Sequence, residues 1–454
     1  MAIKGVECDG HSFVAEAIAN GAKAVVLEQD LPVKKGVTKV LVKDSRVASS
    51  RLAARFYGCP SSKIKTVGVT GTNGKTTAAY LVNEILSRAD QRCGVIGTVC
   101  YKIKDKVAPA KTTTPGPIEL QQLLHEMVVV GCDYAIIEVS SHSLDQHRVD
   151  EVSFDVAVFT NLTQEHLDYH GTMDRYFDAK AKLFDSLGSD ALAVLNSDDP
   201  YSAKLTRRTG SKVMTYGMDN ACDVKAKVGS SSLEATEFVI QAFGAEVGLT
   251  TKLIGRHNLY NVLAATCVGL SCGIRLDQVA QALEGFEGAP GRLERIRCGQ
   301  PFEIFVDYAH TDNAIACVLS TLRALAEKRI ISVFGCGGDR DRSKRPLMGK
   351  VAQRYSDYVI LTSDNPRGED PMEIVRQIES GMDGGRKNYK VILDRYRAIQ
   401  EALQIAEPQD VVVICGKGHE QFQILRDKRV PFDDRQAVRK ILNEHMIYGV
   451  RGTT

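Results

Sequence analysis

The residues with the clearest chemical potential form a short glycine-rich segment, GTNGKTT, at positions 71–77. An apolar run at 64–69 has the pattern of a buried strand, and the sequence from Thr76 onward has that of a helix. A glycine-rich turn into a helix N-terminus presents backbone N–H groups and the positive end of the helix dipole to phosphate oxygens. Lys75 would place a charge on the outer phosphates, and the Thr76 hydroxyl would bind Mg²⁺. We therefore predict a nucleoside triphosphate site.

One residue departs from the usual phosphate-loop pattern. Val69 stands where G-x-x-x-x-G-K-[ST] has its first glycine. A strand-to-helix turn that needs glycine only for its backbone is the alternative interpretation. The Gly-Lys-Thr-Thr sequence between a predicted strand and a predicted helix favours phosphate binding.

Composition limits the class of protein. The 454 residues exceed one ordinary core and predict about three domains. With 44% hydrophobic and 25% charged residues and a net charge of +2, neither nucleic acid nor a membrane surface is predicted as the main partner. The 12 cysteines include no C-x-x-C pair, which favours reduced thiols over disulfides or zinc. Without a signal peptide or a bilayer-spanning apolar run, we expect a cytoplasmic protein with no membrane insertion.

The elements that must position the segment alternate between strands and helices, which predicts an α/β fold with mostly parallel sheets. Further central strands are predicted at 134–139, 156–159 and 191–195, with helices at 121–129, 173–187 and 258–271. An antiparallel excursion is predicted at 222–253. Later strands are predicted at 303–306, 330–334, 358–361, 390–393 and 411–414.

Three domains follow from this pattern and from two boundary segments, a Pro-Ser-Ser linker at 60–62 and a Gly/Pro-rich stretch at 285–292. A small N-terminal α/β domain is predicted at 1–62. A central domain with a parallel sheet and the phosphate loop is predicted at 63–289. A smaller, doubly wound, Rossmann-like domain is predicted at 290–454.

Three polar loops of the last domain follow strands directly, at 307–310, 364–367 and 416–420. Ligands of open α/β sheets bind at the carboxyl ends of the strands. Several polar loops at one edge are a stronger signal than any one loop alone, so we predict a ligand site there.

Other polar residues have two interpretations each. Glu138 ends a strand and is either a metal-binding carboxylate or a surface acid. His166 and His170 are spaced like a zinc pair, or are two structural histidines. Lys180 and Lys182 lie on an amphipathic helix, where the default interpretation is two solvated lysines.

Eleven ordered motifs resemble those of the Mur ligases, and most closely the branch that adds diaminopimelate. They are GTNGKTT, TTTP (112–115), EVSSH (138–142), TNLTQEHLDYH, AKAKLF, GRHNLYN, GRLE, DYAH, GCGGDRD, DNPR and GKGHE. The resemblance covers essentially the entire chain, and so many motifs in one order do not arise by chance.

The resemblance implies ligands for many residues. ATP binding is implied for Gly71, Thr72, Asn73, Gly74, Lys75, Thr76, Thr77, Asn258, Arg292 and Asp307. Binding of a UDP-N-acetylmuramoyl-dipeptide is implied for Thr113, Thr114, Ser140, Gln146 and Arg148. Binding of meso-diaminopimelate is implied for Arg340, Asp364, Asn365, Pro366, Arg367, Gly416 and Glu420. Two Mg²⁺ ions are implied at Thr76, Glu138, His166 and Lys180, the last as a carbamate formed with CO₂.

The implied activity is amide ligation through an acyl phosphate in peptidoglycan precursor synthesis, by a monomer, with Lys75, Lys180 and His310 as catalytic residues. An L-lysine-adding Mur ligase or a folylpolyglutamate synthase is an alternative, and so is a nucleotide-binding regulator without ligase activity. Arg367 discriminates among the ligases, because an arginine suits a substrate with an extra carboxylate.

Two departures from the family pattern bear on these expectations. Glu165 precedes His166 where the family has aspartate, which keeps a carboxylate. The family's N-terminal domain begins with an Asp-Ser-Arg segment that cradles uridine, and Met1 stands where that segment should already have ended. We expect a truncated N-terminal domain with weakened affinity for the UDP moiety.

Overall fold

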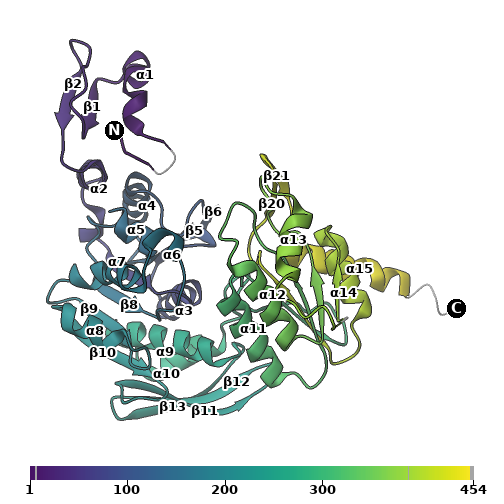
Figure 1. Ribbon diagram of the computed structural model, residues 1–454. Helices are drawn as coiled ribbons and strands as arrows, with labels where there is room; N and C mark the ends of the chain where they lie inside the picture. Colours follow the sequence, from purple (N-terminus) through teal and green to yellow (C-terminus); the bar gives the residue numbers. More distant parts are fainter. Residues whose placement is uncertain (6–7, 387, 450–454) are drawn as a thin grey trace. The chain divides into compact units, whose positions relative to one another are not determined.

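The computed structural model describes residues 1–5, 8–386 and 388–449, and the chain divides into two compact units. The first comprises Met1–Asp223 and Ala264–Ile274, and the second comprises Val224–Leu263 and the chain from Arg275 onward. Many of their elements are labelled in Figure 1. The predicted three-domain division stays a prediction, and each unit is described separately.

The first unit begins with a small group of helices and strands. It consists of η1 (Gly10–Phe13), α1 (Val14–Ala19), β1 (Ala24–Leu27), β2 (Thr38–Leu41) and α2 (Ser45–Phe56). Strands β1 and β2 pair in parallel over a small buried cluster that includes Val14, Val25 and Leu27. Asp44 starts α2 by accepting hydrogen bonds from the N–H groups of Arg46 and Val47.

A larger sheet fills the rest of the first unit. Its strands are β3 (Lys65–Thr70), β4 (Cys93–Ile96), β5 (Cys100–Ile103), β6 (Lys106–Pro109), β7 (Tyr134–Glu138), β8 (Val156–Phe159), β9 (Leu192–Asn196) and β10 (Lys212–Gly217). They lie in the order β10-β9-β8-β3-β7-β4-β5-β6, parallel from β10 to β4 and antiparallel beyond.

The helices of the first unit connect these strands. They are η2 (Pro60–Ser62), α3 (Lys75–Arg88), α4 (Pro117–Val129), α5 (Ser141–Asp145), α6 (Leu167–His170), α7 (Met173–Asp185) and α8 (Ser202–Arg208). Because β8, β3 and β7 are parallel neighbours, the loops after them meet at one edge of the sheet. This edge is where the phosphate loop lies.

The second unit starts with an antiparallel meander, as predicted. Its strands are β11 (Val224–Ser231), β12 (Thr236–Ala242) and β13 (Ala245–Thr251). Helix α9 (Arg256–Ser271) passes from this unit into the first, and α10 (Leu276–Glu284) follows in the second.

A second α/β sheet contains β14 (Glu294–Arg295), β15 (Glu303–Asp307), β16 (Ile330–Phe334), β17 (Tyr358–Leu361), β18 (Tyr389–Val391) and β19 (Val411–Cys415). Its order is β14-β15-β19-β16-β17-β18, and all pairs except β14–β15 are parallel. The helices are α11 (Asp312–Leu325), α12 (Lys344–Tyr355), α13 (Pro371–Glu379), α14 (Arg395–Ile405) and α15 (Asp434–Gly449). A hairpin of β20 (Phe422–Leu425) and β21 (Lys428–Pro431) precedes α15.

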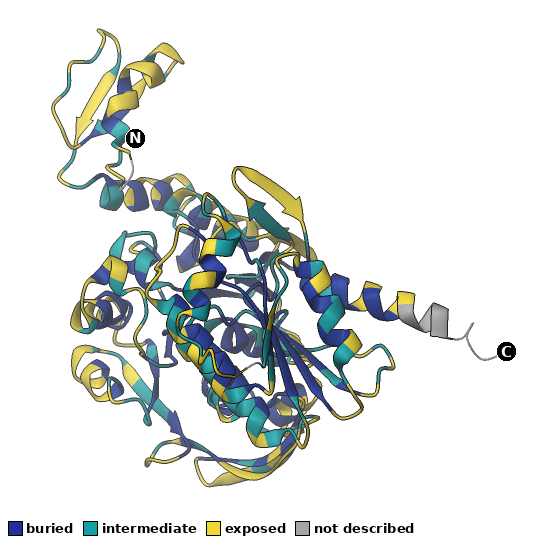
Figure 2. Cartoon of the chain, turned by 45° about the vertical axis from the view of Figure 1, so that its right-hand side comes forward, coloured by how far each residue is buried: buried dark blue, intermediate teal, exposed yellow. Residues whose placement is uncertain are grey.

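The second α/β sheet has a separate hydrophobic cluster on each of its two faces. Val411 and Val413 pack in a cluster with residues of α11, α12 and α13, whereas Val412 and Ile414 pack with residues of α14 and α15. Alternate residues of one strand point to opposite faces, so the sheet is covered on both sides. The central strands β16 and β19 are accordingly buried throughout, dark blue in Figure 2. The predicted α/β class is confirmed.

No helix in the described ranges combines the length and the apolar character that crossing a membrane requires.

Candidate active site

The phosphate loop lies between β3 and α3, as predicted. Gly71 and Gly74 have φ angles of 147° and 90°, which favour glycine. A Cβ at Gly71 would lie 1.9 Å from Oγ1 of Thr160, so no side chain fits there. The loop after β8 holds the turn, because the N–H of Asn73 donates to Oδ1 of Asn161 at 3.0 Å.

Helix α3 begins in a way that suits an anion. Gly74 is its N-cap, and no side chain of the described residues caps it. The first N–H groups of a helix have no partner within the helix, so they are donors for a bound anion. The Nζ atom of Lys75 curls over the loop and donates to the carbonyl oxygens of Gly71 at 2.9 Å and Thr72 at 2.8 Å. The geometry therefore fits a phosphate group.

Glu138 ends β7 beside the start of α3 and is completely buried, not a surface acid. Its Oε2 accepts hydrogen bonds from the hydroxyls of Thr76 and Thr98, both at 2.9 Å. Its Oε1 accepts one from the N–H of Thr98 at 2.8 Å. Oxygen donors from Glu138 and Thr76 thus lie together, and Mg²⁺ prefers oxygen ligands. Thr98 was not predicted as part of the site.

Lys180 is not the solvated lysine of the default interpretation, because only 2% of its surface is exposed. It projects from α7, and its Nζ donates to the carbonyl oxygen of Gly71 at 2.7 Å. Burial, with the nearby charge of Lys75, holds the pKa of Lys180 well below its ordinary value. Lys182 fits the default interpretation, because it is exposed and pairs with Asp145 at 3.2 Å.

The two histidines lie in an aromatic cluster around His142. The ring centroid of His142 is 4.8 Å from that of His166 and 5.5 Å from that of His170. Burial lowers the pKa of His166 to about 4. No group of three or more His, Cys, Asp or Glu residues within the described ranges could hold a metal ion, so the zinc-pair interpretation gains no support. His166 as a Mg²⁺ ligand stays a prediction.

The residues predicted to bind the UDP-linked substrate converge near the end of β7. Oγ1 of Thr114 donates to the carbonyl oxygen of Glu138 at 2.7 Å and accepts from the N–H of Ser140 at 3.1 Å. Arg148 donates to the carbonyl oxygen of Thr114 at 2.8 Å and to Oε1 of Gln146 at 2.6 Å. Thr113 lies beside them, with its hydroxyl 3.1 Å from that of Thr98.

In the second unit, Asp307 ends β15 and organises the loops predicted to contact ATP. Its carboxylate accepts hydrogen bonds from the N–H groups of Leu293 and Ala309, both at 2.7 Å, and burial raises its pKa. The Arg292 guanidinium lies 4.6 Å from the ring centroid of Tyr308. Nδ1 of His310 lies 2.8 Å from the carbonyl oxygen of Tyr308.

Asn258 lies near the start of α9, and its side chain is buried. Its Nδ2 donates to the carbonyl oxygen of Ile254 at 2.9 Å, and its Oδ1 accepts from Asn261 at 3.2 Å. Asn258 therefore anchors the start of the helix, and its contact with ATP stays a prediction.

The residues predicted to bind diaminopimelate lie on loops after β16, β17 and β19. Nδ2 of Asn365 donates to Glu420 at 2.9 Å. Arg367 has a φ angle of 50°, and its Nη1 donates to the carbonyl oxygen of Gly338 at 2.7 Å. Gly416 approaches Asp364 so closely that a Cβ would lie 2.7 Å from Oδ2. In the loop after β17, Pro366 is buried, whereas Arg340, in the loop after β16, is exposed.

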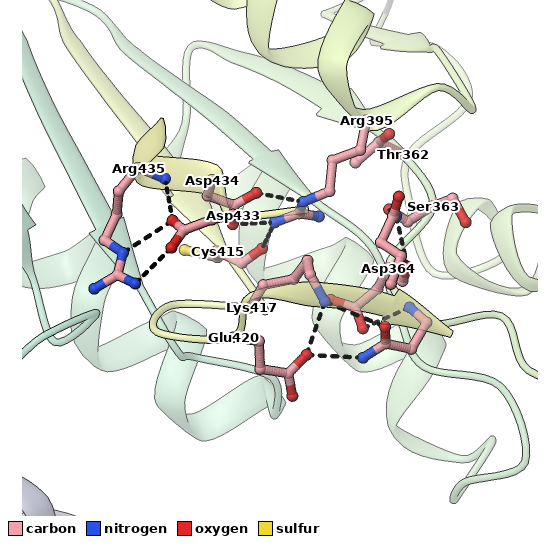
Figure 3. Close-up of polar contacts among 12 residues, drawn as sticks. Thr362, Ser363, Asp364, Arg395, Cys415, Lys417, Glu420, Asp433, Asp434 and Arg435 are labelled. Atoms are coloured by element: carbon pink, nitrogen blue, oxygen red, sulfur yellow. Dashed lines mark hydrogen bonds and ion pairs between the residues drawn. The ribbon is translucent and has the colours of Figure 1, made fainter. Parts of the chain in front are cut away.

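A fully buried lysine that was not predicted as a site residue, Lys417, lies in the loop between Gly416 and Glu420 (Figure 3). A buried arginine, Arg395, supports the end of β19: its Nη2 donates to the carbonyl oxygen of Cys415 at 2.9 Å and to Asp434 at 2.8 Å. Lys417 belongs to the predicted polar loop at 416–420, but lysine and arginine are usually exposed, so nothing in the sequence indicated that either side chain is buried.

Two protein-family patterns match the chain over the regions that carry these loops. The Mur ligase middle domain matches residues 69–269, and the Mur ligase glutamate ligase domain matches residues 291–418. The chain belongs to the Mur ligase family.

Relatives of this Mur ligase include proteins named UDP-N-acetylmuramoyl-L-alanyl-D-glutamate–2,6-diaminopimelate ligase. The protein of Caldanaerobacter subterraneus subsp. tengcongensis is 45% identical over 98% of the chain and 92% of its own length. The protein of Geobacillus thermodenitrificans is 44% identical over 97% of the chain and 91% of its own length.

A solved structure with the same protein name is 35% identical, with a TM-score of 0.68 over 96% of this Mur ligase and 90% of that chain. MurF from Thermotoga maritima in complex with ADP is 20% identical, with a TM-score of 0.68 over 99% and 94% of the two chains. At that identity, the second likeness supports the fold alone.

Proposed function

We propose that this Mur ligase adds meso-2,6-diaminopimelate to UDP-N-acetylmuramoyl-L-alanyl-D-glutamate, with ATP, in the cytoplasmic synthesis of peptidoglycan precursors. One observation carries the proposal: 45% identity over 98% of the chain to a ligase named for this reaction. The phosphate loop and the polar loops after β17 and β19 support it.

ATP binds with its phosphates on the 71–77 loop. Lys75 supplies a positive charge to the outer phosphates, and the N–H groups at the start of α3 supply further donors. Thr76, Glu138, His166 and a carboxylated Lys180 would hold Mg²⁺, which neutralises phosphate charge when bound.

Carboxylation of Lys180 requires a neutral amine, because only the free electron pair attacks CO₂. The lowered pKa of Lys180 supports this chemistry, since it increases the neutral fraction of the amine near neutral pH. The C–N bond forms as a proton leaves the nitrogen, and the product is an anion where a cation was. The carbamate would lie near the carbonyl oxygen of Gly71, and its negatively charged oxygens would be suitable ligands for a metal ion.

The reaction itself consists of two transfers. An oxygen of the D-glutamyl carboxylate attacks the terminal phosphorus of ATP, which gives an acyl phosphate and ADP. The neutral amine of meso-diaminopimelate then attacks the acyl carbon, and phosphate leaves as the amide forms. Phosphoryl transfer depends mainly on positioning and charge stabilisation, so Lys75 and His310 act as electrostatic groups and no covalent enzyme intermediate is needed.

The substrates are assigned to the predicted domains. Residues 1–62, with Thr113, Thr114, Ser140, Gln146 and Arg148, bind the UDP-linked dipeptide. The loops after β16, β17 and β19 bind the amino acid. Arg367 selects diaminopimelate over L-lysine, because a guanidinium pairs with the extra carboxylate.

The test is ADP release by the purified full chain, with mass analysis of the product. Sustained ADP release, beyond one equivalent per enzyme, should require both the UDP-linked dipeptide and meso-diaminopimelate, and the product should carry one added diaminopimelyl residue. L-lysine, or glutamate with a folate, should support little turnover. Equal use of L-lysine, folate-dependent ligation, or ATP binding without ligation would each overturn the proposal in favour of the corresponding alternative.

A further inference from the structure

Lys417 is an unusual residue for a loop at the carboxyl end of a sheet, because its side chain is completely buried. Its Nζ donates to Oε2 of Glu420 at 2.7 Å and to Oδ1 of Asn365 at 3.2 Å. A buried ammonium needs such partners, since an unpaired charge away from water is costly. The three residues therefore form one polar unit that joins the loop after β19 to the loop after β17.

The amide of Asn365 is largely occupied within the protein. Its Oδ1 accepts hydrogen bonds from Lys417 and from the N–H of Ile424, the latter at 3.0 Å, which uses both acceptor positions of a carbonyl oxygen. Its Nδ2 donates to Glu420 at 2.9 Å. Asn365 thus holds Glu420 in place and has no acceptor position left for a substrate ammonium.

Glu420 is held by one oxygen only. Both Lys417 and Asn365 donate to Oε2, whereas Oε1 accepts no hydrogen bond from the described part of the chain. Figure 3 shows one oxygen of Glu420 with dashed lines and the other directed away from Lys417. The Glu420 side chain is 23% exposed, compared with 0% for Lys417. One carboxylate oxygen is therefore fixed, and the other is presented outward.

We propose that Lys417 is a positioning residue for the amino-acid substrate, because it fixes the Glu420 carboxylate that receives the substrate's ammonium group. The inference rests on the proposed ligase function and adds a residue that the substrate does not touch. Lys417 is too deeply buried to contact a ligand, so its effect passes through Glu420. In the sheet, β16 lies between β19 and β17, so the loops after β19 and β17 do not follow neighbouring strands. The hydrogen bond between Lys417 and Asn365 connects these two loops.

Lys417→Met tests the role, because methionine keeps the length of an unbranched side chain and removes the charge and donors. In the full chain, the KM for meso-diaminopimelate should rise by about 10–100-fold, the range expected for loss of a hydrogen bond between charged groups. The KM for ATP should stay within about twofold, and so should kcat at saturating amino acid. Lys390→Met is the matched control, since it removes the exposed Lys390–Glu401 pair of the same unit.

A double-mutant cycle separates positioning from general destabilisation. If Lys417 acts through Glu420, Lys417→Met should change kcat/KM for diaminopimelate by no more than about twofold in a Glu420→Gln background. Full additivity of the two effects, or an unchanged KM for diaminopimelate in Lys417→Met, would overturn the inference.

Lys417→Gln extends the test if Lys417→Met does not fold, because glutamine retains a donor for Asn365 but no charge. It should show the same selective rise in KM for diaminopimelate, and an equal rise for ATP would overturn the inference. Wild-type protein that ligates no diaminopimelate would overturn the proposed function and this inference together. If the wild-type protein ligates diaminopimelate but the Lys417 variants leave its KM unchanged, the inference alone would be overturned.

Discussion

Arg367→Ala should narrow the discrimination between diaminopimelate and L-lysine. Nη1 of Arg367 already donates to the carbonyl oxygen of Gly338 at 2.7 Å, which fixes the guanidinium. Within the described ranges, Nε and Nη2 donate to no other residue, so this edge can pair with a substrate carboxylate. Each hydrogen bond between charged groups contributes about 1.5–3 kcal/mol, so loss of two parallel bonds should cut kcat/KM for meso-diaminopimelate by at least ~10²-fold. L-lysine cannot make these bonds, so its kcat/KM should change far less.

The assay is amino-acid-dependent ADP release with each substrate, and its informative quantity is the ratio of the two kcat/KM values. Alanine keeps a side chain at the φ angle of 50°, so the backbone strain at this position is similar in both proteins. Arg376→Ala, which removes an exposed arginine paired with Glu373, is the control. A KM for ATP that rises in parallel would indicate a distorted loop, and an unchanged ratio between the amino acids would refute the assignment of Arg367.

Three further expectations follow from buried charges. Lys180→Ala should abolish most ligase activity, and short carboxylates such as formate should restore part of it, whereas Lys182→Ala should stay active in the same assay. Arg395→Met should lower the free energy of unfolding, measured with urea, by about 3–5 kcal/mol because it leaves Asp434 charged and buried, and Arg395→Met with Asp434→Leu should recover much of the loss. Hydrogen bonds from Arg345, with smaller contributions from the N–H of Asp339 and the charge of Arg342, lower the pKa of Glu369 from 4.5 to about 2, so the ionised carboxylate contributes stability above pH 4.5 that is lost as the pH falls toward 2. Glu369→Gln should therefore reduce the acid sensitivity of unfolding in that window.

Local sequence was sufficient to predict the phosphate loop and most of the strands. The turn at Gly71 and Gly74 depends on backbone angles that glycine adopts readily, so its position could be read without knowing the rest of the fold. The strand Val411–Cys415 is a continuous buried apolar run, which is typical of a parallel sheet. The antiparallel meander at 222–253 was also confirmed.

Several strands were not predicted, among them β4, β5 and β6. The run from Cys93 to Pro109 forms β4, β5 and β6, but its four-residue strands are interrupted by glycines and a turn, and their sequence has no long period. Of the three, only β4 pairs with a strand distant in the chain, β7, whereas β5 pairs with β4 and β6 pairs with β5 as antiparallel sequence neighbours. A local pattern therefore could not report the partner of β4, which only the completed sheet supplies.

The burial of charged side chains is the second feature that local sequence patterns could not reveal, although the family resemblance names Lys180. Lys180 lies on an amphipathic helix whose pattern is equally compatible with a solvated lysine, and its burial depends on the Gly71 loop 109 residues earlier. Arg395 finds Asp434 39 residues later along the chain. The burial of such side chains becomes evident only in the folded structure, where residues distant in the sequence supply their hydrogen-bond partners.

The strand order explains why the polar loops of the second unit act together. The strand β19 is last in sequence among the parallel strands but lies between β15 and β16, so its loop enters the middle of the carboxyl edge. Lys417 can therefore reach Asn365 from the loop after β17, although 52 residues separate them. A substitution in one loop should then change the geometry of the other, and Glu420, which receives hydrogen bonds from both loops, is where that coupling should be measurable.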